Sequence, residues 1–382
     1  MARNLCAQGD QAVSKQALQK AMTNKRFLVF LRLIFKNILA ERLKKQADVS
    51  LWQHTLFKRI LVQDSTILKL PKTLFAMFSG VSNGQSQVAN ARMQFAFDLL
   101  QERVVYLSVD PYSLNDIKKA HCLNVKQGDL ILRDRGYLST AEVERIIGLK
   151  ADFIYRYKHG ITYLDVVTGE PIKLLERLKD NPSLDIMVRL VDKKGPVVRL
   201  VATAVREELA NRRRQKLKKE AHGQPGKECL ALLSWSIFIT SIRQEQMDYN
   251  ALFQLYKLRW RVEILFKAMK SNLRLDKIHT IPSQQFHFMV YAKLILLILI
   301  TRLIYLPARL IIKKLFDKEI SIIKLTAFIA ENPMNMIDIV RELLVYDHQP
   351  KKQLTALARY CCYDKRRKRS NYDKIAQDIF LS

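Results

Sequence analysis

Four polar side chains of complementary chemistry recur at fixed spacing in one short segment: Tyr256, Arg259, Glu263 and Lys270. Apolar residues at helical spacing predict a helix over about residues 249–272: Leu255, Leu258, Val262, Leu265, Phe266 and Met269. With Tyr256 at zero, Arg259, Glu263 and Lys270 fall at roughly 300°, 340° and 320° around that helix. A carboxylate beside a phenol, a guanidinium and an ammonium suits a metal-bound phosphodiester. The alternative is an amphipathic helix with ordinary charge pairs on its wet side.

Two aspartates occupy segments that otherwise predict buried strands. Asp64 lies within the strand expected over 59–70, and Asp134 ends the short apolar strand that follows Gly128. A carboxylate is costly to bury unless it is paired or bound to a cation. Oxygen ligands from several elements make a Mg²⁺ site, and two such ions ~4 Å apart assist phosphoryl transfer. The alternative is that Asp64 caps a turn and Asp134 caps a loop.

The elements that must position these residues follow a β-β-β-α-β-α-β order. Further strands are expected at 91–99, 103–109 and 152–157, and helices at 114–123 and 139–147, the second with a capping box from Ser139 to Glu142. This order predicts a mixed sheet with helices against it. Next comes a β-rich insertion with strands at 186–192, 197–205 and 230–240 and a basic loop at 211–219.

Five segments are therefore expected along the chain. They are a helical N-terminal region that could bind DNA (1–56), a first part of the catalytic core (57–157), the insertion (158–240), a second part of the core (241–290) and a helical C-terminal region with a basic tail (291–382). Within the N-terminal region, a helical stretch capped at Ser14 is expected over 10–46.

The charge balance points to a polyanionic partner. Lys and Arg number 65 against 36 Asp and Glu, a formal net charge of +29, and basic runs occur at 211–219 and 365–369. Nucleic acid is the leading partner, while a solvated face or a tail is the simpler account of each run. The five cysteines show no CxxC pair, which argues against a zinc site or a disulfide framework and fits a reducing cytoplasm. The N-terminus shows no apolar signal core. The apolar stretch at 286–306 is interrupted by Lys293 and Arg302, so it predicts a buried helix rather than a membrane span.

Together these motifs resemble the DDE transposases of bacterial insertion sequences, specifically the insertion-sequence-4 group. That group carries a Tyr-(2)-Arg-(3)-Glu-(6)-Lys signature, which Tyr256, Arg259, Glu263 and Lys270 match at every spacing. The segments beginning Asp64-Ser-Thr and Asp134-Arg-Gly-Tyr are also typical, and the resemblance covers about 57–290. It implies a ribonuclease-H-like mixed α/β core in which Asp64, Asp134 and Glu263 hold two Mg²⁺ ions, with Mn²⁺ as a substitute.

The resemblance also implies roles for the neighbouring residues. Tyr256, Arg259 and Lys270 would grip phosphates near the cleaved end, and Trp235 would stack on a base flipped from the duplex. Apart from the resemblance, Trp235 beside Ile237 and Phe238 would be assigned to the core.

The expected function is a Mg²⁺-dependent DNA transposase. It would nick the transposon end, form and open a hairpin, and transfer the freed 3′-OH into target DNA, working as a homodimer on terminal inverted repeats. Alternatives are a metal-dependent DNA nuclease and an inactive DNA-binding derivative. Residues 1–56 are few for reading inverted repeats, so the expectation also includes a shortened copy or recognition through the C-terminal region.

Overall fold

The structure is a computed structural model that describes residues 14–40, 56–80, 87–191, 194–221, 223–275, 277–346, 349 and 351–364. The chain divides into two compact units, and each is described by itself. Unit one comprises the described parts of Met1–Leu51, Asp64–Asn115 and Trp260–Ser370, and unit two those of Trp52–Gln63 and Asp116–Arg259. The chain therefore passes from one unit to the other directly before Asp64 and directly after Arg259.

The strands of unit one begin with the second half of β1 (Arg59–Leu70). β2 (Ala89–Asp98) lies between β1 and β3 (Arg103–Pro111) and pairs antiparallel with β3. β2 is almost wholly buried, and its Phe95 meets Phe266 of α10 (Trp260–Ser271) edge to face, with ring centroids 5.7 Å apart. All three predicted strands are confirmed, with ends shifted by no more than two residues.

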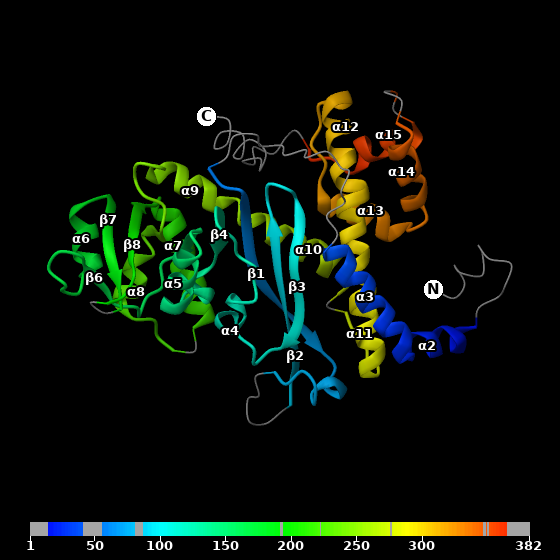
Figure 1. Ribbon diagram of the computed structural model, residues 1–382, viewed down its shortest axis with the longest axis horizontal. Helices are drawn as coiled ribbons and strands as arrows, with labels where there is room; N and C mark the ends of the chain where they lie inside the picture. Colours follow the sequence, from blue (N-terminus) through cyan, green and yellow to red (C-terminus); the bar gives the residue numbers. More distant parts are fainter. Residues whose placement is uncertain are drawn as a thin grey trace. The chain divides into compact units, whose positions relative to one another are not determined.

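Helices form the rest of unit one. They are α2 (Lys15–Thr23), α3 (Lys25–Ala40), the short η1 (Lys72–Leu74), α10, α11 (Ser283–Leu299), the π-helical η3 (Ile300–Tyr305), α12 (Leu306–Phe316), α13 (Ile322–Glu331), α14 (Asn335–Leu344) and α15 (Lys352–Tyr360). Ser14 caps α2 by accepting a hydrogen bond from the Ala17 amide, as predicted. α3 packs along α11 (Figure 1), where the ring centroids of Phe27 and Phe288 lie 5.4 Å apart. The predicted helical character of both terminal regions is confirmed over the described residues. Residues 41–46 and the basic run at 365–369 lie outside them.

The segment Ser283–Phe316 has the length and apolarity of a membrane-spanning helix. An 18-residue window of it has a mean hydropathy of 2.2, but 56% of that window is buried inside the protein. Its two interrupting cations each donate to a backbone carbonyl. Lys293 donates to the Arg274 carbonyl at 2.9 Å, and Arg302 donates to the Ile38 carbonyl at 2.6 Å. The prediction of a buried helix is the one that this packing supports.

Unit two is built on a mixed sheet in the order β1-β4-β5-β9-β8-β7-β6. The strands are β4 (Asp129–Arg133), β5 (Asp152–Arg156), β6 (Tyr163–Asp165), β7 (Ser183–Leu190), β8 (Val197–Ala204) and β9 (Trp235–Thr240). β1, β4 and β5 run parallel, and from β5 to β6 each neighbouring pair is antiparallel. The mixed sheet and the abrupt end of β4 before Asp134 are confirmed. A ribonuclease-H-like fold remains a prediction.

The helices of unit two are α4 (Asp116–Ala120), η2 (Arg135–Tyr137), α5 (Thr140–Gly148), α6 (Leu174–Asp180), α7 (Glu207–Glu220), α8 (Lys227–Leu232) and α9 (Tyr249–Lys257). α5 has the predicted cap, since the Ser139 side chain accepts from the Glu142 amide. The reciprocal half of the expected capping box is replaced, because the Glu142 carboxylate accepts from Arg133 and Arg145 instead. α4 is shorter than the helix expected over 114–123. The described cysteines, Cys122, Cys229, Cys361 and Cys362, carry free thiols.

Two expectations for the insertion were wrong. Residues 211–219 form most of helix α7 instead of a loop, and the strand expected over 230–240 begins only at Trp235, after helix α8. The run contains strong helix formers and no Gly or Pro, while Glu207 and Glu208 begin the helix and Lys218 and Lys219 end it. This order of charge favours a helix because it complements the helix dipole. A run of basic residues also suits a solvated loop, which is why the sequence alone predicted a loop here.

The single helix expected over 249–272 is two helices. The last turn of α9 tightens, with Leu258 and Arg259 amides bonded to the carbonyls three residues before them, at 3.1 Å each. α10 then begins at Trp260. Tyr256 consequently lies on α9, Arg259 in the turn between the helices, and Glu263 and Lys270 on α10, so the common stripe calculated for one helix does not apply.

Candidate functional site

Asp134 occupies the end of a wholly buried strand. β4 leads directly to it, and its extended backbone (φ −79°, ψ 165°) turns into the short helix η2. Its side chain makes no capping hydrogen bond to η2, and its Oδ1 atom is buried with no hydrogen-bond partner among the described residues. The predicted alternative, a loop-capping aspartate, therefore lacks its bond. A buried carboxylate oxygen without a donor is suited to receive a cation.

Tyr256 is tied to the same strand end. It is only 8% exposed, and its hydroxyl donates to the Arg133 carbonyl at 3.2 Å, one residue before Asp134. Its ring packs on Phe238 with centroids 4.5 Å apart, and the Arg259 guanidinium lies 5.7 Å from the ring centroid. The phenol thus has a structural partner in addition to the phosphate contact expected from the sequence.

A cavity of about 320 Å³ opens beside Tyr256 and lies wholly within unit two. Its lining combines aromatic side chains, among them Trp235, Phe253 and Tyr256, with the cations Arg135, Arg156 and Lys257. The Trp235 indole N–H is buried with no hydrogen-bond partner among the described residues. Aromatic faces and cations together suit a base joined to a phosphate.

Helix α7 holds the strand that carries Trp235. Arg213 donates to the Trp235 carbonyl and to the Ser236 hydroxyl, each at 3.0 Å. Burial, and then the positive charge of Arg156, lower the pKa of Arg213. Burial also raises the pKa of Tyr157, another lining residue, to about 12, so its phenol is neutral near pH 7 and the cations set the charge of the cavity.

Asp64 and Glu263 are carried by unit one. Asp64 is half-buried in β1, and its Oδ1 accepts from the Ser65 amide at 2.8 Å. Glu263 lies in the first turn of α10 and Lys270 in the last, and both side chains are half-buried. The apolar side chains predicted to face the core are buried as expected: Leu255, Leu258, Val262, Leu265, Phe266 and Met269. The half-buried charges argue against an ordinary solvated helix face.

The predicted residues are thus divided between the units: Asp134, Trp235, Tyr256 and Arg259 belong to unit two, and Asp64, Glu263 and Lys270 to unit one. Over the described part of the chain, no group of three or more His, Cys, Asp or Glu side chains is arranged to hold a metal ion. The three-carboxylate site remains a prediction. The sequence did not predict three arginines of this region: Arg135 and Arg156, which line the cavity, and the buried Arg133 next to Asp134. An arginine directly after three apolar strand residues, as at Arg133, was the available signal, because such a charge needs buried partners.

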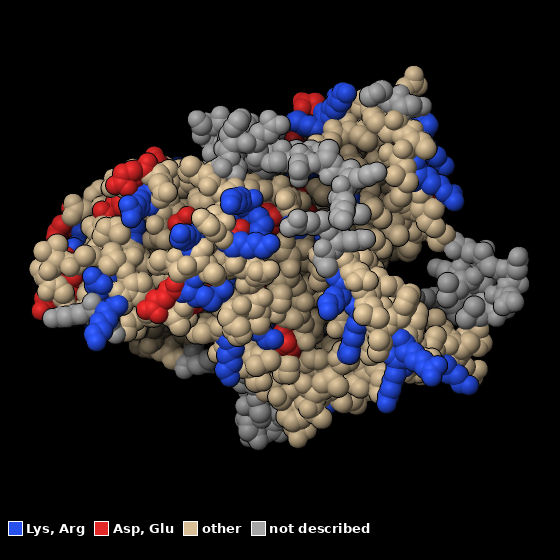
Figure 2. Space-filling model, viewed as in Figure 1, with Lys and Arg blue, Asp and Glu red and all other residues tan. Residues whose placement is uncertain are grey.

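Charge by itself does not locate a DNA-binding surface. On the face shown in Figure 2, lysine and arginine side chains are spread over many places instead of forming one patch. The cations that line the cavity are therefore more informative than the net charge.

Residues 55–299 match the family described as Transposase DDE domain. The chain belongs to this family. It is a transposase, an enzyme that acts on DNA, and transposases with this domain generally use divalent metal ions.

Relatives agree with this assignment. The transposase is 25% identical over 350 residues to the transposase for insertion sequence element IS231F of Bacillus thuringiensis subsp. israelensis, covering 84% of this chain and 73% of the relative. It is 26% identical to the IS231C transposase of subsp. berliner (86% and 74% covered) and 25% identical to the IS1151 transposase of Clostridium perfringens (84% and 73%). A solved piggyBac transposase synaptic complex with hairpin DNA aligns with a TM-score of 0.40 and 9% identity, over 96% of this chain and 67% of that one.

Proposed function

We propose that this transposase cleaves double-stranded DNA at the terminal inverted repeats of an insertion sequence and joins the freed 3′ ends to target DNA. The reaction is cut-and-paste with hairpin intermediates, and it takes place in the cytoplasm, with a homodimer acting on paired ends. The family and the insertion-sequence relatives support the DNA substrate. The signature residues of the insertion-sequence-4 group support the individual steps.

The observation that carries this proposal is the buried, unpartnered Oδ1 of Asp134. β1 and β4 are parallel, and Gln63 and Arg133 are partners in register, so Asp64 and Asp134 each follow one member of a register pair. Asp64, Asp134 and Glu263 would hold the divalent ions, and an all-oxygen ligand set fits Mg²⁺, with Mn²⁺ as a substitute. When bound, a pair of such ions supplies charge stabilisation to a phosphodiester.

The surrounding residues have separate tasks in this proposal. Arg259 and Lys270 contact phosphates beside the cleaved bond as charge clamps. Trp235 stacks on a base that enters the cavity, and its indole N–H donates to an acceptor of that nucleotide, while Arg135 and Arg156 hold the attached phosphate. Tyr256 also orients the strand end that leads to Asp134, through its bond to the Arg133 carbonyl.

Two alternatives predict different products. A metal-dependent nuclease would cut the same DNA without joining it, and an inactive derivative would bind DNA without cutting. Because all three carboxylates are present, the inactive derivative is the weaker alternative.

The test is an assay of the full chain with DNA that carries the inverted repeats of its element, in Mg²⁺ or Mn²⁺. The expected products are cleaved ends, hairpins and strand-transfer joints, and Glu263→Ala should remove all three while DNA binding persists. Glu176→Ala is the matched control, since this exposed glutamate on α6 forms an ion pair with Lys173 and lies outside the proposed site. Cleavage without joining would indicate the nuclease. DNA binding without cleavage in either metal would contradict the proposed chemistry.

A further inference from the structure

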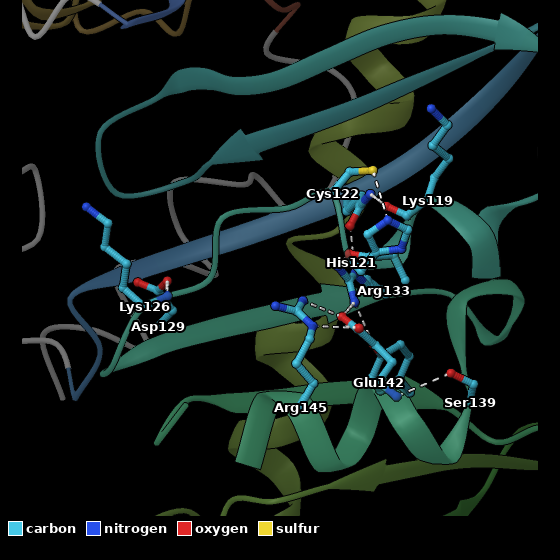
Figure 3. A network of polar contacts seen from close by, with 12 residues as sticks. Lys119, His121, Cys122, Lys126, Asp129, Arg133, Ser139, Glu142 and Arg145 are labelled. Atoms are coloured by element: carbon cyan, nitrogen blue, oxygen red, sulfur yellow. Dashed lines mark hydrogen bonds and ion pairs between the residues drawn. The ribbon is translucent and has the colours of Figure 1, made fainter. Parts of the chain in front are cut away.

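Arg133 is a fully buried arginine whose guanidinium links several elements of unit two. It donates to Gln63 Oε1 at 2.8 Å, to Glu142 Oε1 at 2.6 Å and to the Tyr155 hydroxyl at 2.9 Å. It also donates to the Ala120 carbonyl at the end of α4, at 2.7 Å. We call these residues the Arg133 network; it joins β1, β4, β5, α4 and α5. Figure 3 shows Glu142 held between Arg133 and Arg145.

Arg133 and Glu142 form an ion pair of 2.6 Å, and both side chains are almost wholly buried. Burial alone would raise the pKa of Glu142, but hydrogen bonds from Arg145 and the charge of Arg133 lower it. A charge pair of this kind is costly to desolvate and stabilises little compared with apolar packing, so its presence calls for another reason.

That reason is suggested by its position at the last register pair of β1 and β4, where β4 ends. Gln63 and Arg133 are register partners on neighbouring parallel strands, and their side chains are bonded to each other on one face. Gln63 also reaches the Lys119 carbonyl at 3.5 Å, so both side chains engage the last carbonyls of α4. Side chains alternate across an extended strand, so the residue after Arg133, the extended Asp134, leaves from the opposite face. At the start of the same strand pair, the Arg59 guanidinium donates one hydrogen bond to each oxygen of the Asp129 carboxylate.

We propose that Arg133 is a positioning residue that, through Gln63, fixes the last register pair of β1 and β4 and thereby sets the direction in which Asp134 leaves β4. Arg133 contacts neither substrate nor metal ion; it acts through the backbone. The inference rests on the proposed function, because Asp134 is taken as a ligand of a divalent ion. It assigns a cause to the buried charge pair that packing alone does not supply.

The test measures Mn²⁺ binding to the purified full chain by electron paramagnetic resonance, independently of cleavage. Gln63→Met removes the strand-to-strand side-chain bond while leaving the Arg133–Glu142 pair, and Arg133→Lys keeps the charge but loses the planar fork. The matched control is Arg199→Lys. Arg199 is equally buried, binds Asp185 at 2.7 Å through two nitrogens and donates to the Met247 carbonyl, but lies on β8.

The expected result is that Gln63→Met and Arg133→Lys weaken Mn²⁺ binding at least about tenfold, and that cleavage recovers at high Mn²⁺. Arg199→Lys should lower the thermal midpoint by a similar amount without changing Mn²⁺ affinity. Unchanged Mn²⁺ affinity in Gln63→Met, or an equal loss in Arg199→Lys, would overturn the positioning role. Asp134→Asn separates the two claims: if it binds Mn²⁺ like the unaltered protein, the proposed metal site itself is wrong.

Discussion

Replacing Tyr256 with phenylalanine removes one hydroxyl and keeps the ring that packs against Phe238. The substitution therefore tests the 3.2 Å bond to the Arg133 carbonyl with little change in packing. If the hydroxyl served only DNA phosphates, the protein without DNA would be equally stable with either side chain. The bond predicts a loss of stability in the protein alone.

The size of this loss follows from one hydrogen bond made by a buried phenol. Such a bond contributes about 0.5–1.5 kcal/mol to the free energy of unfolding. In a domain of 150–250 residues, 1 kcal/mol shifts the thermal midpoint by about 2–4 °C, so we expect a decrease of roughly 1–6 °C. Since the bond lies one residue before Asp134, cleavage should also fall, by about the same free energy or up to roughly tenfold.

The assay is thermal and urea unfolding followed by circular dichroism, with DNA cleavage measured in parallel. Tyr249→Phe is the control, because Tyr249 lies on the same helix and is exposed. A Tyr256→Phe variant with unchanged stability and lost cleavage would refute the reasoning, since the hydroxyl would then act on DNA alone.

Three further predictions follow from the same unit. Trp235→Ala should weaken binding of an end whose base is unstacked by about 1–3 kcal/mol, seen with 2-aminopurine at that base, and Trp235→Phe should retain most of the affinity. The lowered pKa of Glu142 means that its stabilisation is present above its ordinary pKa of 4.5 and is lost as pH falls through the lower folded value. Urea unfolding of Glu142→Gln should accordingly show a deficit at neutral pH that shrinks in acid; a constant deficit would contradict the assignment. Lys216→Ala and Lys219→Ala, on the exposed side of α7, should each reduce the salt dependence of DNA binding by a slope of about 0.9 if that lysine contacts a phosphate. An unchanged slope would show that the helix does not touch DNA.

Strand positions were predictable because local patterns dominate there. Apolar β-branched residues bounded by turn residues gave β1, β4 and β5 to within a residue or two, and the serine caps of α2 and α5 were visible as local chemistry. The signature residues were predicted from their spacing and the two aspartates from their place in apolar strands, and their roles in catalysis remain predictions.

The remaining features depend on contacts between distant segments. No Gly or Pro marks the turn between α9 and α10. The residues whose side chains bond to Arg133 lie between 70 positions before it and 22 positions after it in the sequence. The sequence of α7 has strong helix formers and no Gly or Pro, which favour a helix, but its many basic residues are also typical of a solvated loop. The cavity beside Trp235 is formed by residues of several elements, and no single stretch of sequence displays it.

The long apolar helical segment Ser283–Phe316 has a consequence for synthesis of the protein. Helix α3, which includes the Ile38 carbonyl bonded to Arg302, precedes it in the chain, whereas α13 and α14, which pack against its π-helical segment, follow it. A nascent chain that ends soon after Phe316 therefore presents a segment apolar enough for a membrane, with only part of its cover. Chaperone binding and aggregation should consequently be greatest for translation intermediates of this length. The yield of active transposase would then depend on folding as well as on catalysis.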